Sequence, residues 1–431
     1  MKKSLIALAA LAAVSAVSAQ STVSVYGRLD LGYSSANQTN DFGTISSSGT
    51  VFQRQASSAT SLGANNSRTT SRLGFNGVED LGGGLKATFN YEVALAPDNI
   101  GTKIGSGDKA FGEFDNTRVG FGGTRLANLG LSGSFGTVVL GTFLNAHDTL
   151  RGFNVNTFNM AGGDFIARHN ANNADAGTAG ATFVNAATTH LGNKTLIDSG
   201  AAVNATGSTL RDTAQALKAI NGVGFNGRSH NAVAYSSPVI SGFSVGLGIQ
   251  ADKSSRTGTP AADVRNIDGQ TVSLSYANGP LKATFVTGNA KVNDPDGSAT
   301  TAYQTQKAKD QGFAASYDLG FAQLTLVSEG VNASVAGGLL AGYKVKTNAT
   351  EIGAKFPMGA LTPYVALASG KITVNPAGAE SVYKTSAQQV GALYDLSKRS
   401  YMYASYGQDK MMINNTGLVR DGFTLGLVHS F

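Results

Sequence analysis

The 431-residue sequence predicts an all-β chain that folds as a 16-stranded antiparallel transmembrane β-barrel. Three observations support this prediction. Sixteen stretches, mostly of about ten residues, alternate apolar and polar side chains, and ten residues suffice for a tilted strand to cross a bilayer. Short and long connections between these stretches also alternate along the chain. The first twenty residues, finally, have the pattern of an export signal.

The N-terminal segment predicts a signal peptide over residues 1–19. Lys2 and Lys3 precede an apolar run at 5–14, and the small residues at 16–19 suit cleavage. A membrane anchor is the alternative, but the run is short and polar residues follow it. No later stretch approaches the ~20 apolar residues that a spanning helix needs. We therefore expect an exported protein whose residues 20–431 form a single barrel domain.

The composition suits strands and turns, because glycine is abundant at 55 residues and charged residues make up only 14%. The formal charge of +6 comes from scattered lysines and arginines, which gives little support for nucleic-acid binding. The five histidines show no metal-ligand spacing and cysteine is absent, so neither a metal site, a cofactor nor a disulfide is expected.

The period-two alternation assigns the strands in order. They are predicted at 22–34, 69–78, 85–95, 114–123, 135–144, 229–237, 242–251, 269–277, 281–290, 310–318, 321–330, 349–356, 361–370, 385–395, 400–408 and 421–431. Long polar connections are predicted at 35–68, 96–113, 145–228, 252–268, 291–309, 331–348, 371–384 and 409–420. Both termini fall on the side of the short turns. Such one-sided loops favour a barrel with short periplasmic turns and long extracellular loops over a soluble sandwich.

The residues also resemble the general porins of Gram-negative outer membranes, in the branch found in beta-proteobacteria and Neisseria. The matching stretches are SVYGRLDLGY (24–33), SRLGFNGVEDLGGGLKATFNYE (71–92), SGSFGTVVLG (132–141), NAVAYSSPVISGF (231–243), SYANGPLKA (275–283), YDLSKRSYMYASY (394–406) and the terminal GLVHSF. The resemblance implies a homotrimer of water-filled barrels in the outer membrane, each with its third long loop folded into the pore. It also implies outer-membrane lipid, lipopolysaccharide and the barrel-assembly machinery as partners.

The sequence departs from the family pattern at three places. The family commonly has Arg-Gln where Thr142 and Phe143 follow Leu-Gly, and it tends to have arginine at the position of Ala234. The stretch 145–228 is about twice the expected length, and it lacks a recognisable Pro-Glu constriction motif. Pore size and ion preference are therefore left open by the resemblance.

Charged residues on the polar side of the strands are the candidate pore-lining groups. Such charges in a narrow aqueous constriction sort ions by sign. The candidates are Arg28, Arg72, Lys86 and Arg118 on the wall, with Asp148, Arg151 and Asp164 as partners from the third long loop. The arginines predict a preference for anions. The alternative is that these arginines are solvated lumen residues, paired with nearby carboxylates, outside the narrowest part.

An enzymatic function is not predicted. Residues 242–246 fit G-x-S-x-G and residues 222–227 fit G-x-G-x-x-G, but neither stands in the strand–turn–helix context that the chemistry requires. The predicted function is passive diffusion of small hydrophilic solutes and ions. The alternative is a substrate-specific channel or receptor that uses the enlarged stretch 145–228, in which 208–220 is helix-like. A secreted sandwich is a further possibility, which extraction without detergent would reveal.

The C-terminus continues the alternation to its final residue. Phe423, Leu425 and Leu427 share the face of His429 and Phe431. In a closed barrel the last strand must pair with the first, so this strand cannot fray without opening two edges. The resemblance adds that a terminal aromatic is similar to the signal read by the assembly machinery, with His429 and Phe431 as its candidate residues.

Overall fold

A computed structural model describes residues 22–41, 55–63, 69–95, 121–155, 228–253, 266–294, 304–335, 342, 344–375 and 380–431. Its elements are β1 (Thr22–Asn40), β2 (Gln55–Gly63), β3 (Arg72–Gly82), β4 (Leu85–Leu95), β5 (Phe121–Gly133), β6 (Gly136–Leu144), α2 (Asp148–Arg151), β7 (Arg228–Ser236), β8 (Phe243–Lys253), β9 (Asn266–Asn278), β10 (Leu281–Asp294), β11 (Gln304–Asp318), β12 (Gln323–Val335), β13 (Lys344–Lys355), β14 (Leu361–Asn375), β15 (Ser381–Asp395), β16 (Ser400–Ile413) and β17 (Thr416–Ser430). Within these ranges, no helix has the length and apolar character to cross a membrane.

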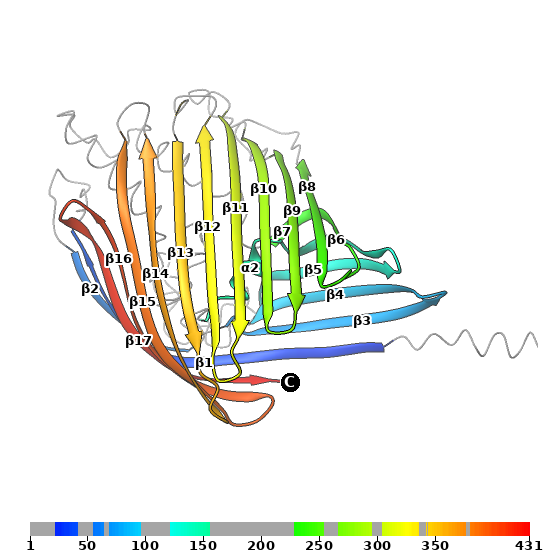
Figure 1. The fold of residues 1–431 in the computed structure, drawn as a ribbon, viewed down its shortest axis with the longest axis horizontal. Helices are drawn as coiled ribbons and strands as arrows, with labels where there is room; N and C mark the ends of the chain where they lie inside the picture. The colour runs from blue at the N-terminus through cyan, green and yellow to red at the C-terminus, as the bar shows by residue number, and fades with distance from the viewer. Residues whose placement is uncertain are drawn as a thin grey trace, which may run out of the picture.

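The strands form one closed antiparallel sheet (Figure 1). Successive strands pair with each other, and β17 returns to pair with β1. β2 pairs with the second half of β1 and β3 with its first half, so that these two strands share one position in the wall. Seventeen strands therefore make a barrel of sixteen positions, which confirms the predicted fold.

One rim has short turns and the other has longer connections. The structure corrects the predicted lengths of the latter, because strands extend beyond their predicted ends. β14 continues to Asn375 and β15 begins at Ser381, which leaves little of the connection predicted at 371–384. The connection predicted at 409–420 is instead a tight turn at Asn414 and Asn415. Asn414 has a φ of 52°, a left-handed conformation that asparagine tolerates in hairpin turns.

The longer strands have a physical explanation. Alternating hydrophobicity marks only the part of a strand that has lipid on one side and water on the other. Above that band both faces meet water, so the pattern ends although backbone pairing continues. β15 and β16 show this, since Lys384 still pairs with Met412 beyond the alternating region.

The fourth predicted strand, 114–123, is misplaced. The structure has β5 at Phe121–Gly133, and residues 114–120 lie outside the described ranges. The register between β4 and β5 shifts near Glu92, where Arg125 is an extra residue of the bulge. A bulge interrupts strict alternation, which is why the pattern did not reveal the true position of this strand.

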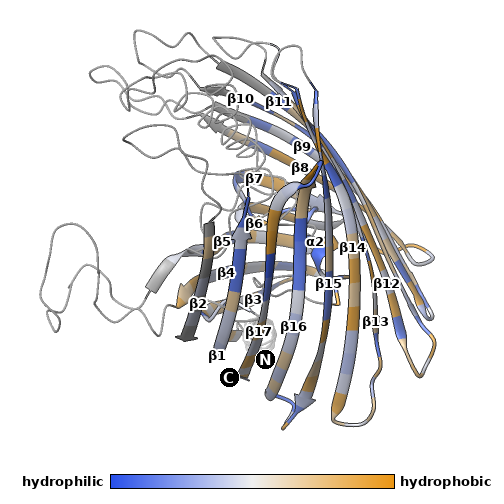
Figure 2. Ribbon diagram, turned by 90° about the vertical axis from the view of Figure 1, so that its left-hand side faces the viewer, coloured by the Kyte–Doolittle hydropathy of each residue, from blue (hydrophilic) through white to orange (hydrophobic). Residues whose placement is uncertain are grey.

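Large apolar side chains are exposed along the wall strands. Hydrophobic and hydrophilic residues alternate along these strands in Figure 2. On β17, for example, Phe423, Leu425 and Leu427 are exposed, while Thr424 and Val428 on the opposite face are buried. The inner face is not uniformly polar. A buried apolar cluster lines the inside of β10–β17 and includes Leu150 of α2. The described core is therefore inside the barrel, against one half of its wall.

Candidate pore constriction

Arginines from four wall strands lie close together, and two of them contact one carboxylate. Arg28 of β1 and Arg72 of β3 are direct partners in the strand register, and Arg125 comes from the bulge of β5. Arg228 begins β7 and lies within electrostatic range of Arg72 and Arg125. Like charges directly opposite each other destabilise a sheet, so the Arg28–Arg72 pairing favours a functional role. We call these four residues the arginine wall.

Glu92 on β4 is the acidic centre of this cluster. Its side chain is only 4% exposed, and Oε1 lies 2.5 Å from Arg125 Nε and 3.7 Å from Arg72 Nη1. Tyr26 donates a hydrogen bond to Oε2 at 3.0 Å. Burying a carboxylate is costly unless it is paired, and two guanidinium groups meet that need here. Asp148 lies within electrostatic range of Arg228, so four arginines face two carboxylates and the wall keeps an excess of positive charge.

The residues predicted from the sequence fall in several places. Arg72 belongs to the cluster, and Arg28 Nε donates to Ser430 Oγ at 3.2 Å beside it. Lys86 is exposed on the same face of β4 as Glu92, six residues closer to the short-turn rim. Arg118 and Asp164 lie outside the described residues. The sequence analysis did not identify Arg125 or Arg228 as pore-lining residues. The alternation of Ala127, Leu129 and Leu131 could have located β5, and with it Arg125.

The start of the third long connection lies inside the barrel. Residues 145–155 leave β6, form α2 and reach β11, as the interior position of α2 in Figure 2 illustrates. Asp148 and Arg151, predicted as partners across the pore, pair with each other at 3.1 Å on α2. Leu150 packs against Gly312 of β11, and Val155 packs against Gly353 of β13. We call residues 145–155 the inward segment.

His147 anchors the inward segment electrostatically. Its Nε2 contacts Asp310 of β11, and its Nδ1 lies 3.3 Å from Glu329 of β12. All three side chains are buried. Burial alone would lower the pKa of His147, but the adjoining carboxylates outweigh it and raise the pKa from 6.5 to about 9. The residue is therefore an imidazolium at neutral pH.

The same three residues are also close enough together to hold a metal ion. The geometry favours an ion pair instead, because each ring nitrogen faces a different carboxylate. A metal ion binds a single nitrogen of an imidazole ring, whereas a protonated ring donates from both. The cluster thus acts as a clamp between the inward segment and the wall.

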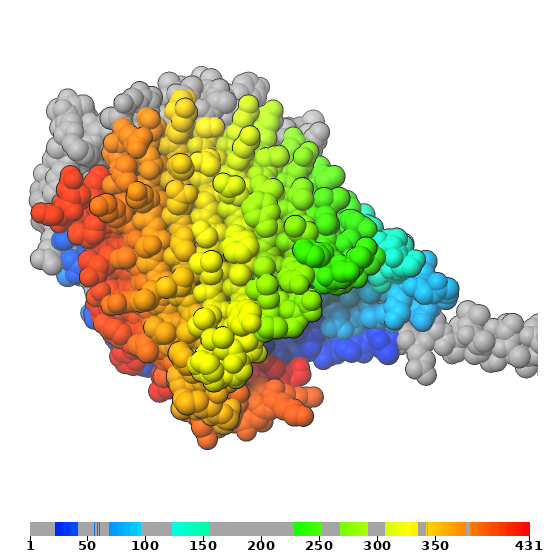
Figure 3. All heavy atoms as spheres, viewed as in Figure 1, coloured from blue at the N-terminus to red at the C-terminus, as the bar shows by residue number. Residues whose placement is uncertain are grey.

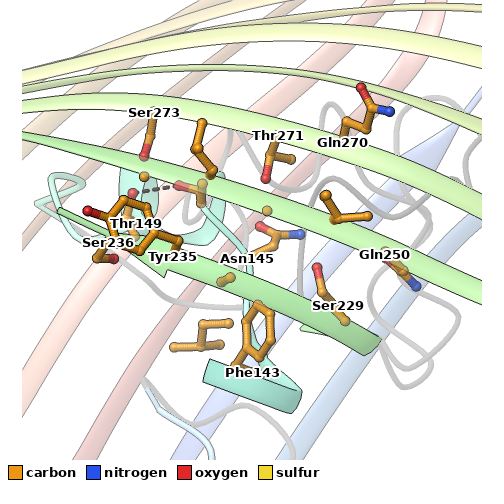
Figure 4. A pocket seen from close by; sticks show the side chains of 18 of the residues that line it. Phe143, Asn145, Thr149, Ser229, Tyr235, Ser236, Gln250, Gln270, Thr271 and Ser273 are labelled. Carbon is orange, nitrogen blue, oxygen red and sulfur yellow. Dashed lines mark hydrogen bonds between the residues drawn. The ribbon is translucent and has the colours of Figure 1, made fainter. Parts of the chain in front are cut away.

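A cavity of about 280 Å³ lies between the inward segment and the wall of β7–β10 (Figure 4). Its lining is uncharged and rich in hydroxyl and amide groups. Labelled examples are Asn145, Thr149, Ser236, Gln250 and Thr271. This side of the interior offers hydrogen bonds without charge, in contrast to the arginine wall.

Comparison with known proteins agrees with this architecture. A family model described as Gram-negative porin matches residues 7–412. The chain belongs to the Gram-negative porin family. As a porin it is a β-barrel channel of the outer membrane, and its short turns face the periplasm.

Individual relatives of the porin extend this result. It is 28% identical to outer membrane porin protein 32 of Delftia acidovorans, over 99% of this chain and 92% of that protein. Its fold is similar to that of an anion-selective porin from Comamonas acidovorans, with a TM-score of 0.59 at 22% identity, covering 96% of this chain and 100% of the other. A trimer form of OmpT from Vibrio cholerae gives a TM-score of 0.56 at 12% identity and covers 95% and 99%.

Proposed function

We propose that the porin passes small hydrophilic solutes passively and prefers anions, with its constriction between the arginine wall and the inward segment. The observation that supports this most directly is the clustering of the four wall arginines, of which only Arg72 and Arg125 contact the carboxylate of Glu92. Charges that line a narrow aqueous path with low-dielectric walls raise the local concentration of counter-ions. The anion selectivity of the Comamonas porin agrees with the proposal.

The inward segment would limit solute size in this mechanism. It is held on β11–β13 by the His147 clamp and by the contacts of Leu150 with Gly312 and of Val155 with Gly353. In this proposal solutes therefore pass on its other side, along the arginine wall. Asp148 and Arg151 neutralise each other and leave the sign of the potential to the wall. Lys86, Arg118 and Asp164 stay proposed lining residues. No cofactor, metal ion or covalent chemistry is part of the proposal.

The proposal is tested by reversal potentials of single porins in planar bilayers under a potassium chloride gradient. The wild type should be anion-selective. Arg125→Gln and Arg72→Gln should shift the reversal potential towards cations, whereas Glu92→Gln should shift it further towards anions, because each change alters the same local field. Lys398→Gln removes a positive charge from the periplasmic rim and should leave selectivity unchanged. Cation selectivity of the wild type, or identical values for all four variants, would refute the proposal.

We further propose that the porin is exported by a signal peptide at 1–19, inserted by the barrel-assembly machinery and assembled as a homotrimer among lipopolysaccharide. The terminal residues support the assembly step. Phe431 N donates to Gly27 O at 3.1 Å, and Ser400 Oγ lies 2.8 Å from His429 Nδ1, so the last residues are integrated into the wall. The trimer form of the Vibrio OmpT supports the oligomeric state.

The uncharged cavity supports a second candidate function, a channel with a preferred polar solute. Hydroxyl and amide groups such as those of Thr271 and Gln250 suit neutral hydrogen-bonding solutes. If this function applies, one solute from a neutral polyol series should block conductance at low concentration. Thr271→Val should then weaken that block without shifting the reversal potential. Equal weak block by every solute would exclude this candidate.

A further inference from the structure

The outward face of β11–β16 carries exposed lysines near the extracellular rim. Each lysine alternates with an inward side chain, which places it on the lipid-facing side of the wall. The residues are Lys307, Lys309, Lys344, Lys346, Lys371, Lys384 and Lys410, here called the lysine belt. Within the described parts of these six strands no carboxylate shares this face: Asp310, Glu329, Glu351 and Asp409 are buried on the inside, and Asp318 and Asp395 lie at the opposite rim. On the adjoining β17, Asp421 shares the outer face and accepts a hydrogen bond from Asn37 Nδ2 at 3.2 Å. The seven lysines therefore leave this face with excess positive charge.

Four members of the belt surround a polar stripe on β12. The strand registers give two parallel rows, Lys309–Asn332–Lys346 and Lys307–Ser334–Lys344. Strand spacing and residue rise place the four lysines at the corners of a rectangle of roughly 7 by 10 Å. Their flexible stems can bring the ammonium groups together over Asn332 and Ser334, which can also hydrogen-bond. This arrangement matches the size and charge of a phosphate group.

Two of the remaining lysines are placed so that their positive charges repel each other. Lys371 of β14 lies opposite Lys384 of β15 in the register, and their inward neighbours Ile372 and Tyr383 are fully buried. The two ammonium groups must therefore share the outer surface, where opposed like charges destabilise the sheet. Lys410 of β16 pairs in the register with Ser386 of β15, which is two residues from Lys384 on the same face. Lys410 therefore brings a third positive charge close to this pair. An anion bound among these three lysines would remove the repulsion.

The depth of the belt matches a layer of lipid headgroups. Lys309, Lys371 and Lys410 each lie four residues beyond an exposed apolar side chain, those of Phe313, Leu367 and Tyr406 respectively. Four residues correspond to about 13 Å along a strand. In Figure 3 the outer surface of these strands, coloured yellow to orange, faces the viewer. The periplasmic rim differs, since Asp318, Asp395, Lys398 and Arg399 are exposed there with both signs.

We propose that the lysine belt binds phosphorylated lipid headgroups of the outer leaflet, with one phosphate subsite on β11–β13 and a second on β14–β16. Juxtamembrane lysines attract anionic lipid at the level where their side chains meet the headgroups. The inference rests on the proposed insertion among lipopolysaccharide and adds the residues and the chemistry of recognition. The one-sided charge also explains how the barrel would distinguish the outer leaflet from the inner one.

The test measures how much diphosphoryl lipid A the detergent-purified porin binds, in mixed micelles at 150 mM salt. Lys371→Gln/Lys384→Gln and Lys344→Gln/Lys346→Gln should each weaken binding roughly thirtyfold. The matched control Lys398→Gln/Arg399→Gln removes the same charge from the periplasmic rim and should bind like the wild type. Lipid A without phosphates should bind the wild type and the belt variants equally weakly.

Three outcomes would overturn the inference: equal binding by the belt and rim variants, equal binding of lipid A with and without phosphates, or displacement by millimolar inorganic phosphate, which would indicate a free-anion site. Folding is checked separately by the conductance and reversal potential of each variant in bilayers of neutral phospholipid. Those values report the proposed channel function, which can fail or hold independently of lipid A binding.

Discussion

Glu92 and His147 are both buried charges held between two groups of the opposite sign. Glu92 lies between two arginines of the wall, and His147 lies between two carboxylates of the opposite wall. A buried charge without a partner costs several kcal/mol, so each residue fixes the position of its partners. The first arrangement holds the arginine wall in place, and the second holds the inward segment away from it.

Raising the pH should release the His147 clamp. The pKa of His147 is raised to about 9 in the folded state, above its ordinary value of 6.5. Its stabilisation is therefore complete below pH 6.5 and is lost as the pH rises through 9, with an upper limit of about 3 kcal/mol. The midpoint of thermal unfolding should be lower at pH 10 than at pH 6, and His147→Gln should remove most of this difference.

His230→Gln is the matched control for this prediction, since His230 is exposed and contacts Thr142 rather than a carboxylate. The control variant should keep the wild-type pH dependence. If His147→Gln keeps it as well, other groups cause the effect and the clamp does not contribute to stability in this range.

The sequence predicts single residues well only where the alternation is regular. Arg28 and Arg72 stand on uninterrupted strands, and their side of the wall follows directly from the neighbouring apolar residues. Arg125 was missed because the bulge at its position shifts the phase of β5. His147 could not be paired from sequence with Asp310, since their contact depends on the path of a loop across the barrel. Local pattern contains no information about such distant pairings.

At the scale of elements, the inward segment depends on two glycines of the facing strands. A Cβ on Gly312 of β11 would lie 2.2 Å from Leu150 Cδ1, and one on Gly353 of β13 would lie 2.6 Å from Val155 Cγ1. Both glycines therefore provide space for α2 and the residues after it. The strands were predicted from their outward residues, whereas this use of their inward glycines became visible only in the structure.

Gly312→Ala should displace the inward segment. Leu150 is 1% exposed and has no room to move, so overpacking should cost about 1–3 kcal/mol. A displaced segment should alter single-channel conductance and increase its fluctuations, as recorded in planar bilayers. The double variant Gly312→Ala/Leu150→Ala removes the clashing methyl group and should restore steady conductance more than either single change does. Additive effects of the two substitutions would show that the residues do not interact.

For the whole molecule, the inner sides of the two halves of the wall differ in packing and charge. The inner side of β10–β17 is packed and buried, while the arginines of β1–β7 are partly exposed inside. The sequence predicts the number of strands and their orientation because lipid imposes one pattern on every outer face. It does not predict this inner asymmetry, because a lumen accepts polar, small and apolar residues alike wherever another segment covers them.

Closure of the whole barrel depends on the seam between β1 and β17. The register runs from Arg28↔Ser430 to Asn40↔Leu418, and Phe431 extends it through two backbone hydrogen bonds with Gly27. The Phe431 ring also covers Gly27 on the outer face, where a Cβ would lie 2.3 Å from the ring. Removal of Phe431 therefore exposes backbone to lipid at the end of the closing seam.

Deleting Phe431 should reduce the yield of assembled barrels several-fold. The barrels that do form should keep wild-type conductance, because the Phe431 ring covers Gly27 on the outer face and its loss removes no side chain of the arginine wall. Assembly is measured as the heat-modifiable fraction in outer membranes, and conductance is measured in bilayers. Phe423→Ala removes an exposed aromatic ring from the same face of β17 and leaves the terminus intact. It should assemble nearly as well as the wild type. Equal losses for the two variants would assign the effect to lost apolar surface instead of the terminal seam.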